Sequence, residues 1–496
     1  MTAASTPWKA GHLPGLSDTE VAWQTLRFEA IPDQPQEIAV PVLTPAQAQA
    51  LAQRVRQSAR AVLQALPVSA LIDRIDRAVA HLLDPHDPLR QQADALLPRV
   101  TGYDAAMVRL GLTRYLQTFR APQLHRFVSE DFSNPKVLDE FQPATKGGMV
   151  RAFGPRLLVH HWAGNVPGLP LWSLACGLLV KAGNIGKLPS AEPVFATLFA
   201  RALVQVDPAL ADCFAIVWWK GGEAEPATTL HAQADTVLAY GGQDTVQEIR
   251  TQVPSTARFL AYGHKLGVAL VGREALDTQR GPAMARLAAL DVARYEQQGC
   301  YSPHVFYVER GARLSPRDFA QHLAGELAAL ARRHPRPALG LADAAAIAQW
   351  RHAVEWSDSG QQAASNPILL GDEASPWAVA YSDRALPLAP TAGWRCIQVV
   401  AVDTLEAAAD ALTAHAPYLQ TAGVAVAPER LYTLSLRLAQ AGMTRVCALG
   451  TMTSPEAGWH HDGGCNLRDL VRFAEIEAGA ERAADRLAPY AQEDGQ

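Results

Sequence analysis

Apolar residues recur at helical spacing in two segments near the start of the chain. The first begins well for a helix, because Thr44 can cap it, Pro45 suits the first helical position and Gln47 completes a capping box. Its apolar stripe consists of Leu51, Val55, Val62, Leu63 and Leu66. The second helix carries a stripe of Leu71, Ile72, Ile75, Val79, Leu82 and Leu83. We expect both helices to pack on a sheet, and the Pro-rich residues 1–40 to form an irregular lead-in.

From about residue 156 the pattern changes to short apolar runs that alternate with helical segments. The predicted strands are 157–160, 185–188, 214–218, 236–240 and 268–271. Helical stretches such as 169–181 and 193–205 lie between them. Alternation of this kind predicts right-handed β-α-β units and a doubly wound, mostly parallel sheet.

A second series of alternating strands and helices follows a long helical segment, 276–298. Its predicted strands are 304–308, 397–402, 424–427 and 446–449, with helices near 315–333, 404–414 and 428–441. The fold class is therefore α/β, and the simplest architecture is two α/β domains with a cleft between them.

Composition is that of an ordinary globular protein of 496 residues, 49% hydrophobic and 19% charged. A net charge of −5 gives no reason to expect a nucleic-acid partner or an anionic membrane surface. The longest apolar run, 169–180, is too short to span a bilayer and contains Pro170. The six cysteines form no CxxC pair and residues 1–9 lack a basic-then-apolar leader, so we expect reduced thiols and a cytoplasmic location.

Two residues far apart in the sequence are candidates for chemistry. Cys300 follows a glycine and precedes Pro303 and a predicted strand, which suits an exposed nucleophile on a turn. Asn165 lies in a loop broken by Gly and Pro, where its amide N–H can stabilise a developing oxyanion. Together they indicate chemistry on a thioester or an aldehyde. The alternative for an isolated cysteine is a small buried hydrophobic residue.

Three further residues follow predicted strands and can line the same crevice, because ligands of open α/β sheets bind beyond the carboxyl ends of the strands. Lys187 could approach a phosphate or a ribose, and Gly241 and Gly242 would let the backbone approach a pyrophosphate. The alternatives are a surface lysine and an ordinary glycine turn. The common dinucleotide fingerprint GxGxxG is absent.

As a set, these motifs resemble the aldehyde dehydrogenase superfamily, and most closely its LuxC-type acyl-CoA reductase branch. The resemblance covers about residues 150–475 and includes the late segment 458–463, Gly-Trp-His-His-Asp-Gly. It implies that Cys300 is the catalytic thiol, that Asn165 supplies the oxyanion amide, and that Lys187 contacts the cofactor ribose. It also implies an aldehyde-dehydrogenase-like fold. We expect N-terminal helices and a dinucleotide-binding domain over 1–272, a catalytic domain over 273–450, and a C-terminal return segment over 451–496.

Two departures from that family pattern are informative. Many aldehyde-oxidising relatives carry a glutamate that activates the hydrolytic water, where this chain has Ala261. Without that carboxylate, a thiol such as coenzyme A is favoured over water as the acyl acceptor or donor. Ser190 stands where NAD-preferring relatives often place a glutamate on the adenosine ribose. A small hydroxyl leaves room for a 2′-phosphate, which favours NADPH, with NADH as the alternative.

The function we expect is NADPH-dependent reduction of an acyl thioester to an aldehyde through a thioester on Cys300. The acyl group would come from acyl-CoA or, by analogy with LuxC-type systems, from an acyl-activating partner enzyme, and we expect a homo-oligomer. The rivals are a CoA-acylating aldehyde dehydrogenase working in the oxidative direction, a non-redox acyltransferase using Cys300, and a catalytically silent scaffold. We predict no metal site, because His460, His461 and Asp462 have no further ligands at helical spacing. A loop that closes the cleft or holds a subunit contact is the favoured interpretation of these three residues, and participation in the active-site wall is the alternative.

Overall fold

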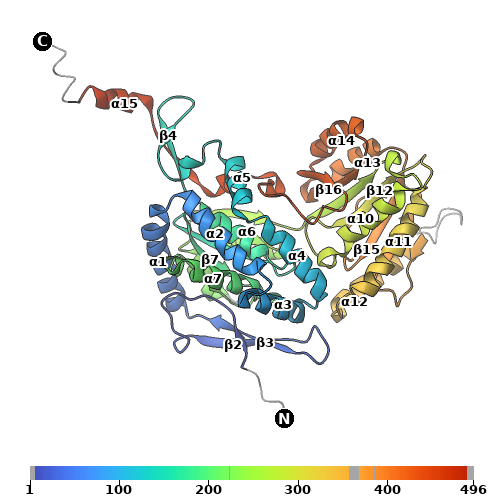
Figure 1. Cartoon of the computed structure of the whole chain (residues 1–496), viewed down its shortest axis with the longest axis horizontal. Helices are drawn as coiled ribbons and strands as arrows, with labels where there is room; N and C mark the ends of the chain where they lie inside the picture. Colours follow the sequence, from blue (N-terminus) through green and yellow to red (C-terminus); the bar gives the residue numbers. More distant parts are fainter. Residues whose placement is uncertain (1–5, 223, 357–367, 385, 489–496) are drawn as a thin grey trace.

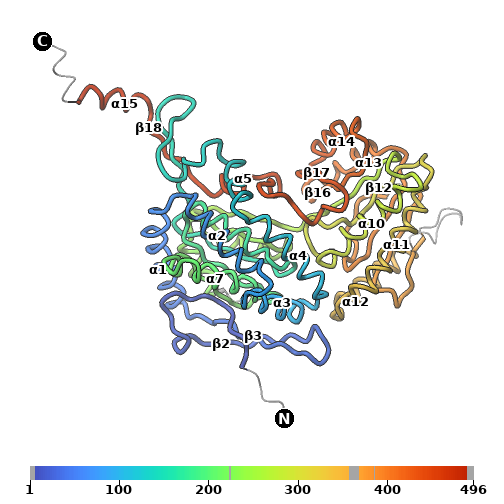
Figure 2. Tube along the Cα trace, in the orientation of Figure 1, coloured from blue at the N-terminus to red at the C-terminus, as the bar shows by residue number. Residues whose placement is uncertain are grey.

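A computed structural model describes residues 6–222, 224–356, 368–384 and 386–488. Two sheets flanked by helices form the two lobes of the molecule, and an N-terminal hairpin and a C-terminal arm extend from the larger lobe (Figure 1). Figure 2 traces the chain from one lobe into the other and back, so that the C-terminal segment returns to the helices of the N-terminal half.

The first sheet is fully parallel and has the strand order β10-β9-β6-β7-β8. Its strands are β6 (Leu157–His161), β7 (Gly183–Lys187), β8 (Phe214–Val217), β9 (Thr236–Tyr240) and β10 (Arg258–Tyr262). The helices between them are α6 (Leu169–Leu179), α7 (Phe195–Val206), α8 (Ala224–His231) and α9 (Gln243–Gln252). The order reverses between β6 and β9, so the crevice that binds ligands in doubly wound sheets lies beyond these two strands. The predicted doubly wound parallel sheet is confirmed.

The second sheet is parallel except at one edge, with the order β13-β14-β15-β12-β11-β16-β17. Its strands are β11 (Leu266–Val271), β12 (Pro303–Glu309), β13 (Ile368–Leu370), β14 (Ala378–Ser382), β15 (Cys396–Val402), β16 (Leu419–Ala425) and β17 (Arg445–Ala448). Its helices are α10 (Arg280–Ala293), α11 (Pro316–Arg333), α12 (Leu341–Trp356), α13 (Leu405–Ala411) and α14 (Pro428–Ala441).

One strand belongs to a different sheet from the one we predicted. We assigned 268–271 to the first sheet, but β11 pairs with β12 and β16 of the second. The chain therefore changes sheet between Tyr262 and Leu266, ahead of the boundary expected at residue 272. The division into functional domains stays a prediction.

The N-terminal region is more ordered than expected. The irregular lead-in predicted for residues 1–40 is wrong, because β2 (Ala22–Phe28) and β3 (Gln36–Val42) form an antiparallel hairpin joined by β1 (Trp8–Lys9). The predicted first helix is confirmed as α1 (Pro45–Val62), including its capping box. Further helices follow: α2 (Val68–Leu83), α3 (Pro88–Thr101), α4 (Ala105–Gln117) and α5 (Ala121–Asp131). Buried residues of α1 pack on one face of the first sheet, and α6 and α7 cover the other with α2 behind them.

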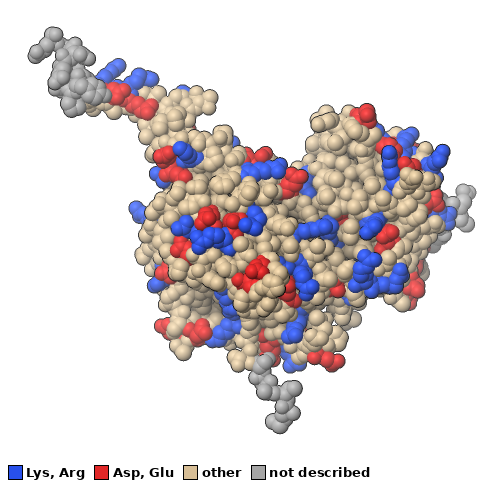
Figure 3. Space-filling view, viewed as in Figure 1, with Lys and Arg blue, Asp and Glu red and all other residues tan. Residues whose placement is uncertain are grey.

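A small antiparallel sheet, β18-β5-β4, carries the C-terminal arm. It contains β4 (Gln142–Pro143), β5 (Met149–Phe153) and β18 (Arg472–Ile476). The following helix, α15 (Ala478–Asp485), projects away from the rest of the molecule (Figure 1). None of the helices that the structure describes is both long enough and apolar enough to cross a bilayer. Acidic and basic side chains are interspersed on the face in Figure 3.

Candidate active site

A pocket of about 420 Å³ lies between the two sheets. The loop after β6 contributes Asn165, the loop after β9 contributes Gly241 and Gly242, and the turn before β12 contributes Cys300. Cys300 and Asn165 are distant in sequence, but the fold brings them to one cavity. The topology therefore places the candidate nucleophile and the candidate oxyanion donor together, as the resemblance implied.

Cys300 is partly exposed on the turn before β12, at the wall of the pocket. Burial raises the pKa of its thiol to about 11, although a hydrogen bond from Gln420 acts in the opposite direction. Gln420 donates through Nε2 to Sγ at 3.5 Å and also to Asp462 Oδ1 at 2.6 Å. The charge of Lys265 acts in the same direction as that hydrogen bond, but the effect of burial is larger. The thiol is protonated at neutral pH and needs a base to react.

The backbone ahead of the cysteine is strained. Tyr295, Glu296 and Gln297 have φ of 50°, 52° and 64°, a left-handed region that non-glycine residues rarely adopt. This turn interrupts the long helix that we predicted over 276–298, so that α10 ends at Ala293.

Buried side chains hold the turn in place. Arg395 donates to both carboxylate oxygens of Glu296, at 2.7 and 2.5 Å. Gln297 Nε2 donates to the carbonyls of Pro303 and Cys396, at 2.7 and 2.9 Å. These contacts fix the direction from which the chain enters the Cys300 turn.

Asn165 points toward that turn. Its side-chain Nδ2 donates to the Gln298 backbone carbonyl at 2.6 Å, and the backbone carbonyl of Asn165 accepts from the Tyr103 hydroxyl at 3.0 Å. A side-chain amide has two N–H bonds, so one remains for an oxyanion. The oxyanion role itself stays a prediction.

Lys187 and Ser190 are found at the end of the neighbouring strand β7, outside the set of residues that line the pocket. The Lys187 ammonium lies 5.9 Å from the centre of the Trp219 ring, and burial lowers its pKa. Ser190 is exposed and accepts a hydrogen bond from Trp218 Nε1 at 3.2 Å. Lys187 is at the carboxyl edge of the first sheet, as predicted, but neither Lys187 nor Ser190 lines the pocket.

Gly241 and Gly242 link β9 to α9 at that same edge. Gly242 is the N-cap of α9, no side chain caps the helix, and a Cβ at this position would meet no atom within 4 Å. The first-turn N–H groups are therefore open to a phosphate, although Asp244 in that turn would oppose a second negative charge. Lys187 ends β7 at the same edge of the sheet, two strands away, and together these groups fit a nicotinamide dinucleotide.

Several pocket residues were not singled out from the sequence. They are Tyr115, Trp172, Tyr240, Tyr262, His264, Lys265 and Gln420. His461 also lines the pocket, and its ring stacks on Tyr262 with 4.3 Å between centres and 3° between planes. The loop that we expected to close the cleft therefore contributes a wall of it.

No aspartate or glutamate is among the lining residues in the described part of the chain. Ala261 is exposed at the end of β10 and does not line the pocket, whereas His264 and Lys265 from the same stretch do. Partial burial lowers the pKa of His264, so this imidazole is neutral at pH 7. The lining thus offers a nitrogen base and no carboxylate, and the nearby Asp462 is held by Gln420.

Comparison with known proteins agrees with this geometry. The sequence profile of the family "Acyl-CoA reductase (LuxC)" matches residues 63–473. Long-chain acyl-protein thioester reductase 2 of Photobacterium leiognathi is 29% identical over 209 residues, which is 40% of this chain and 42% of that protein. Long-chain acyl-protein thioester reductase of Vibrio harveyi is 24% identical over 362 residues, 71% of each chain. The match to the first of these relatives thus spans less than half of its length.

Solved structures show the same fold at low sequence identity. NADP-dependent glyceraldehyde-3-phosphate dehydrogenase from Bacillus halodurans superposes with a TM-score of 0.71 at 11% identity, covering 95% of this chain and all of that one (100%). Aldehyde dehydrogenase 21 from Physcomitrella patens gives 0.70 at 12% identity, covering 96% and 99%. The fold is that of the aldehyde dehydrogenases, and the chain belongs to the acyl-CoA reductase (LuxC) family.

Proposed function

We propose that this protein is an acyl-CoA reductase that reduces an acyl thioester to an aldehyde through a covalent thioester on Cys300. The observation that carries this proposal is a thiol in a pocket whose described lining contains no carboxylate. Many aldehyde-oxidising relatives that release a free acid use a glutamate to activate water, and this chain has Ala261 at that position. The names of the relatives, acyl-protein thioester reductases, support the same direction of reaction.

In the first step the Cys300 sulfur attacks the thioester carbonyl. The thiol must lose its proton, because its pKa is raised to about 11. The neutral imidazole of His264, in the same pocket, is the base we assign to this proton. Asn165 stabilises the tetrahedral oxyanion, and loss of one such donor typically costs about 3 kcal/mol. The donor thiolate then leaves, taking up a proton, and the acyl group stays on Cys300.

A nicotinamide cofactor, when bound, supplies the hydride that reduces the acyl group. The free N–H groups at the start of α9 would hold its pyrophosphate and Lys187 its ribose. Ser190, small and exposed, leaves room for the 2′-phosphate of NADPH. We therefore propose NADPH as the preferred reductant, with NADH as the alternative.

The acyl chain would lie along the aromatic side of the pocket. Tyr115, Trp172 and Trp459 line this side, and Trp172 and Trp459 are in ring contact with 6.2 Å between centres. Burying each methylene there contributes about 0.8 kcal/mol, so long aliphatic chains are favoured. The thioester donor is acyl-CoA or an acyl group carried by a partner protein.

Two features bear on assembly and location. Phe473 and Ile476 are exposed on β18, at the base of the projecting arm, and support our expectation of a homo-oligomer. All six cysteines are free thiols, which supports a reducing compartment such as the cytoplasm.

The experiment follows the absorbance of reduced nicotinamide while acyl-CoA is added to the purified full-length chain. The proposal predicts oxidation of NADPH with one aldehyde formed per NADPH consumed. Acylation of Cys300 without oxidation of either NADPH or NADH would instead establish an acyltransferase. Turnover only with aldehyde, NADP⁺ and coenzyme A would establish the oxidative direction. Absence of both dinucleotide binding and acylation would favour the interpretation as a catalytically silent scaffold.

A further inference from the structure

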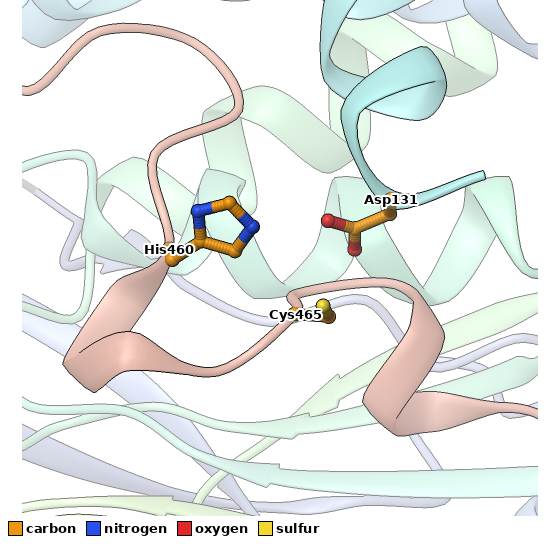
Figure 4. Close-up of side chains that lie close together, drawn as sticks. All are labelled: Asp131, His460 and Cys465. Atoms are coloured by element: carbon orange, nitrogen blue, oxygen red, sulfur yellow. The ribbon is translucent and has the colours of Figure 1, made fainter. Parts of the chain in front are cut away.

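Three metal-ligating side chains meet outside the pocket. Asp131 is the last residue of α5, and His460 and Cys465 belong to the segment that follows β17. One ligand atom from each, a carboxylate oxygen, an imidazole nitrogen and a sulfur, lies within 4.8 Å of the other two. Figure 4 shows the three side chains around one space, with the carboxylate facing the imidazole ring.

Of these three residues, Asp131 gives the strongest indication that the cluster binds a ligand. The residue is only 4% exposed. Its Oδ2 accepts hydrogen bonds from the backbone N–H groups of Leu467 and Arg468, the latter at 3.1 Å. Its Oδ1 is buried and has no partner among the residues that the structure describes. An unpaired buried carboxylate oxygen is costly, and this carboxylate lies within 4.8 Å of two other ligand atoms.

The donor set selects the metal. A thiolate, an imidazole and a carboxylate are all common zinc ligands, with bonds of about 2.0–2.3 Å, whereas calcium and magnesium take oxygen ligands. A tetrahedral site places such ligands about 3.3–3.8 Å apart, so the three groups need to close by roughly 1 Å. We propose that Asp131, His460 and Cys465 bind one Zn²⁺, with a solvent molecule as the fourth ligand.

The site would support the pocket wall rather than take part in the reaction. Its ligands are not among the residues that line the pocket, but the neighbours of His460 are, because Trp459 and His461 both line it. The next residue, Asp462, accepts from Gln420, which donates to the Cys300 sulfur. Bound zinc would tie this segment to α5 and hold the wall in place. The proposal is independent of the reaction assigned to Cys300.

The test uses the full-length chain, freed of any affinity tag and stripped of metal with a chelator. Zinc content after re-addition and gel filtration is measured by elemental mass spectrometry, and Co²⁺ is added separately to record its thiolate charge-transfer band. We expect about one Zn²⁺ per chain, a cobalt spectrum of tetrahedral type with the thiolate band, and a higher thermal unfolding midpoint with zinc than without.

Variants identify the ligands. Cys465→Ser should abolish the charge-transfer band and lower zinc retention at least tenfold, and His460→Gln and Asp131→Asn should lower retention likewise. Cys447→Ser is the matched control, since Cys447 is also a partly exposed free thiol but lies on β17, outside the cluster, and it should retain zinc. Should Asp131→Asn fail to fold, Cys465→Ser and the cobalt spectrum still test whether the cluster binds the metal. Absence of stoichiometric zinc in the wild-type chain, or retention of the thiolate band in Cys465→Ser, would overturn the proposal.

Discussion

The buried pair Glu296–Arg395 gives the most demanding test of how the fold positions Cys300. Arg395 is 0% and Glu296 3% exposed, and two hydrogen bonds join them. The pair clamps two strained turns, since Trp394 and Arg395 also have φ of 52° and 67°. The backbone N–H of Trp394 donates to the Glu296 carbonyl at 3.2 Å. Replacing Arg395 by methionine keeps the apolar stem but removes the counter-charge.

The expected magnitude follows from burial. Breaking a buried ion pair by removing one partner costs about 3–5 kcal/mol, because the other charge stays unpaired in a low-dielectric interior. Five left-handed non-glycine residues, each costing about 1 kcal/mol or more, would then relax toward other conformations. We therefore expect Arg395→Met to lower the free energy of unfolding by about 3–5 kcal/mol and to slow acylation of Cys300. In the double variant Glu296→Gln/Arg395→Met the loss should be smaller, because no charge is left unpaired.

The assay is urea unfolding followed by tryptophan fluorescence, with the rate of Cys300 alkylation as the second readout. Arg437→Met is the control, since its pair with Asp410 is 43% and 57% exposed and should contribute less than about 1 kcal/mol. The reasoning is refuted if Arg395→Met loses no more stability than this control, or if the double variant loses more than the single one.

Three other predictions concern the Cys300 thiol and the ion pairs that Glu309 forms at the end of β12. With a pKa near 11, the alkylation rate of Cys300 in the free protein should rise about tenfold per pH unit from pH 7 to 9; a plateau below pH 8 would contradict this value. Because the hydrogen bond from Gln420 lowers that pKa, Gln420→Ala should slow alkylation at pH 8 about threefold or more, and an unchanged rate would count against the contact. Burial alone would raise the pKa of Glu309, but hydrogen bonds from Arg273 and Arg430 outweigh burial and lower the pKa to about 2. Ionised Glu309 therefore stabilises the fold fully above pH 4.5, and this stabilisation is lost as the pH falls toward 2. Glu309→Gln should therefore cost about 2 kcal/mol at pH 7, with allowance for the half-exposed Arg273, and much less near pH 2 in urea titrations; an equal loss at both values would refute the assignment.

Local signals in the sequence predicted much of the scaffold. The cap at Thr44 and the alternation of buried runs with helices set out α1 and most strands of both sheets. The hairpin β2–β3 was missed because its prolines and polar residues mask a strand pattern, and Pro41 itself lies inside β3. β16 begins at Leu419, five residues before the predicted 424. The prediction missed its first residues because Gln420 and Thr421 are polar, although both are fully buried.

The parts of the site that escaped prediction depend on long-range packing. Gln420 reaches Cys300 only because β16 lies next to β11, which lies next to β12. Asp131 lies near His460 because the C-terminal segment returns to the end of α5. The spacing of these residues along the chain does not predict that contact. Cys300 and Asn165 could be singled out because each lies in a loop with its own local signature.

Intact-protein mass spectrometry after incubation with an acyl thioester, without nicotinamide, tests the central claim most directly. The account predicts a gain of one acyl group on the wild-type chain, located on the peptide that contains Cys300, with the same gain in Cys447→Ala and none in Cys300→Ala. An equal gain on the Cys300→Ala chain would show that another group accepts the acyl load, and the assignment of Cys300 would be wrong.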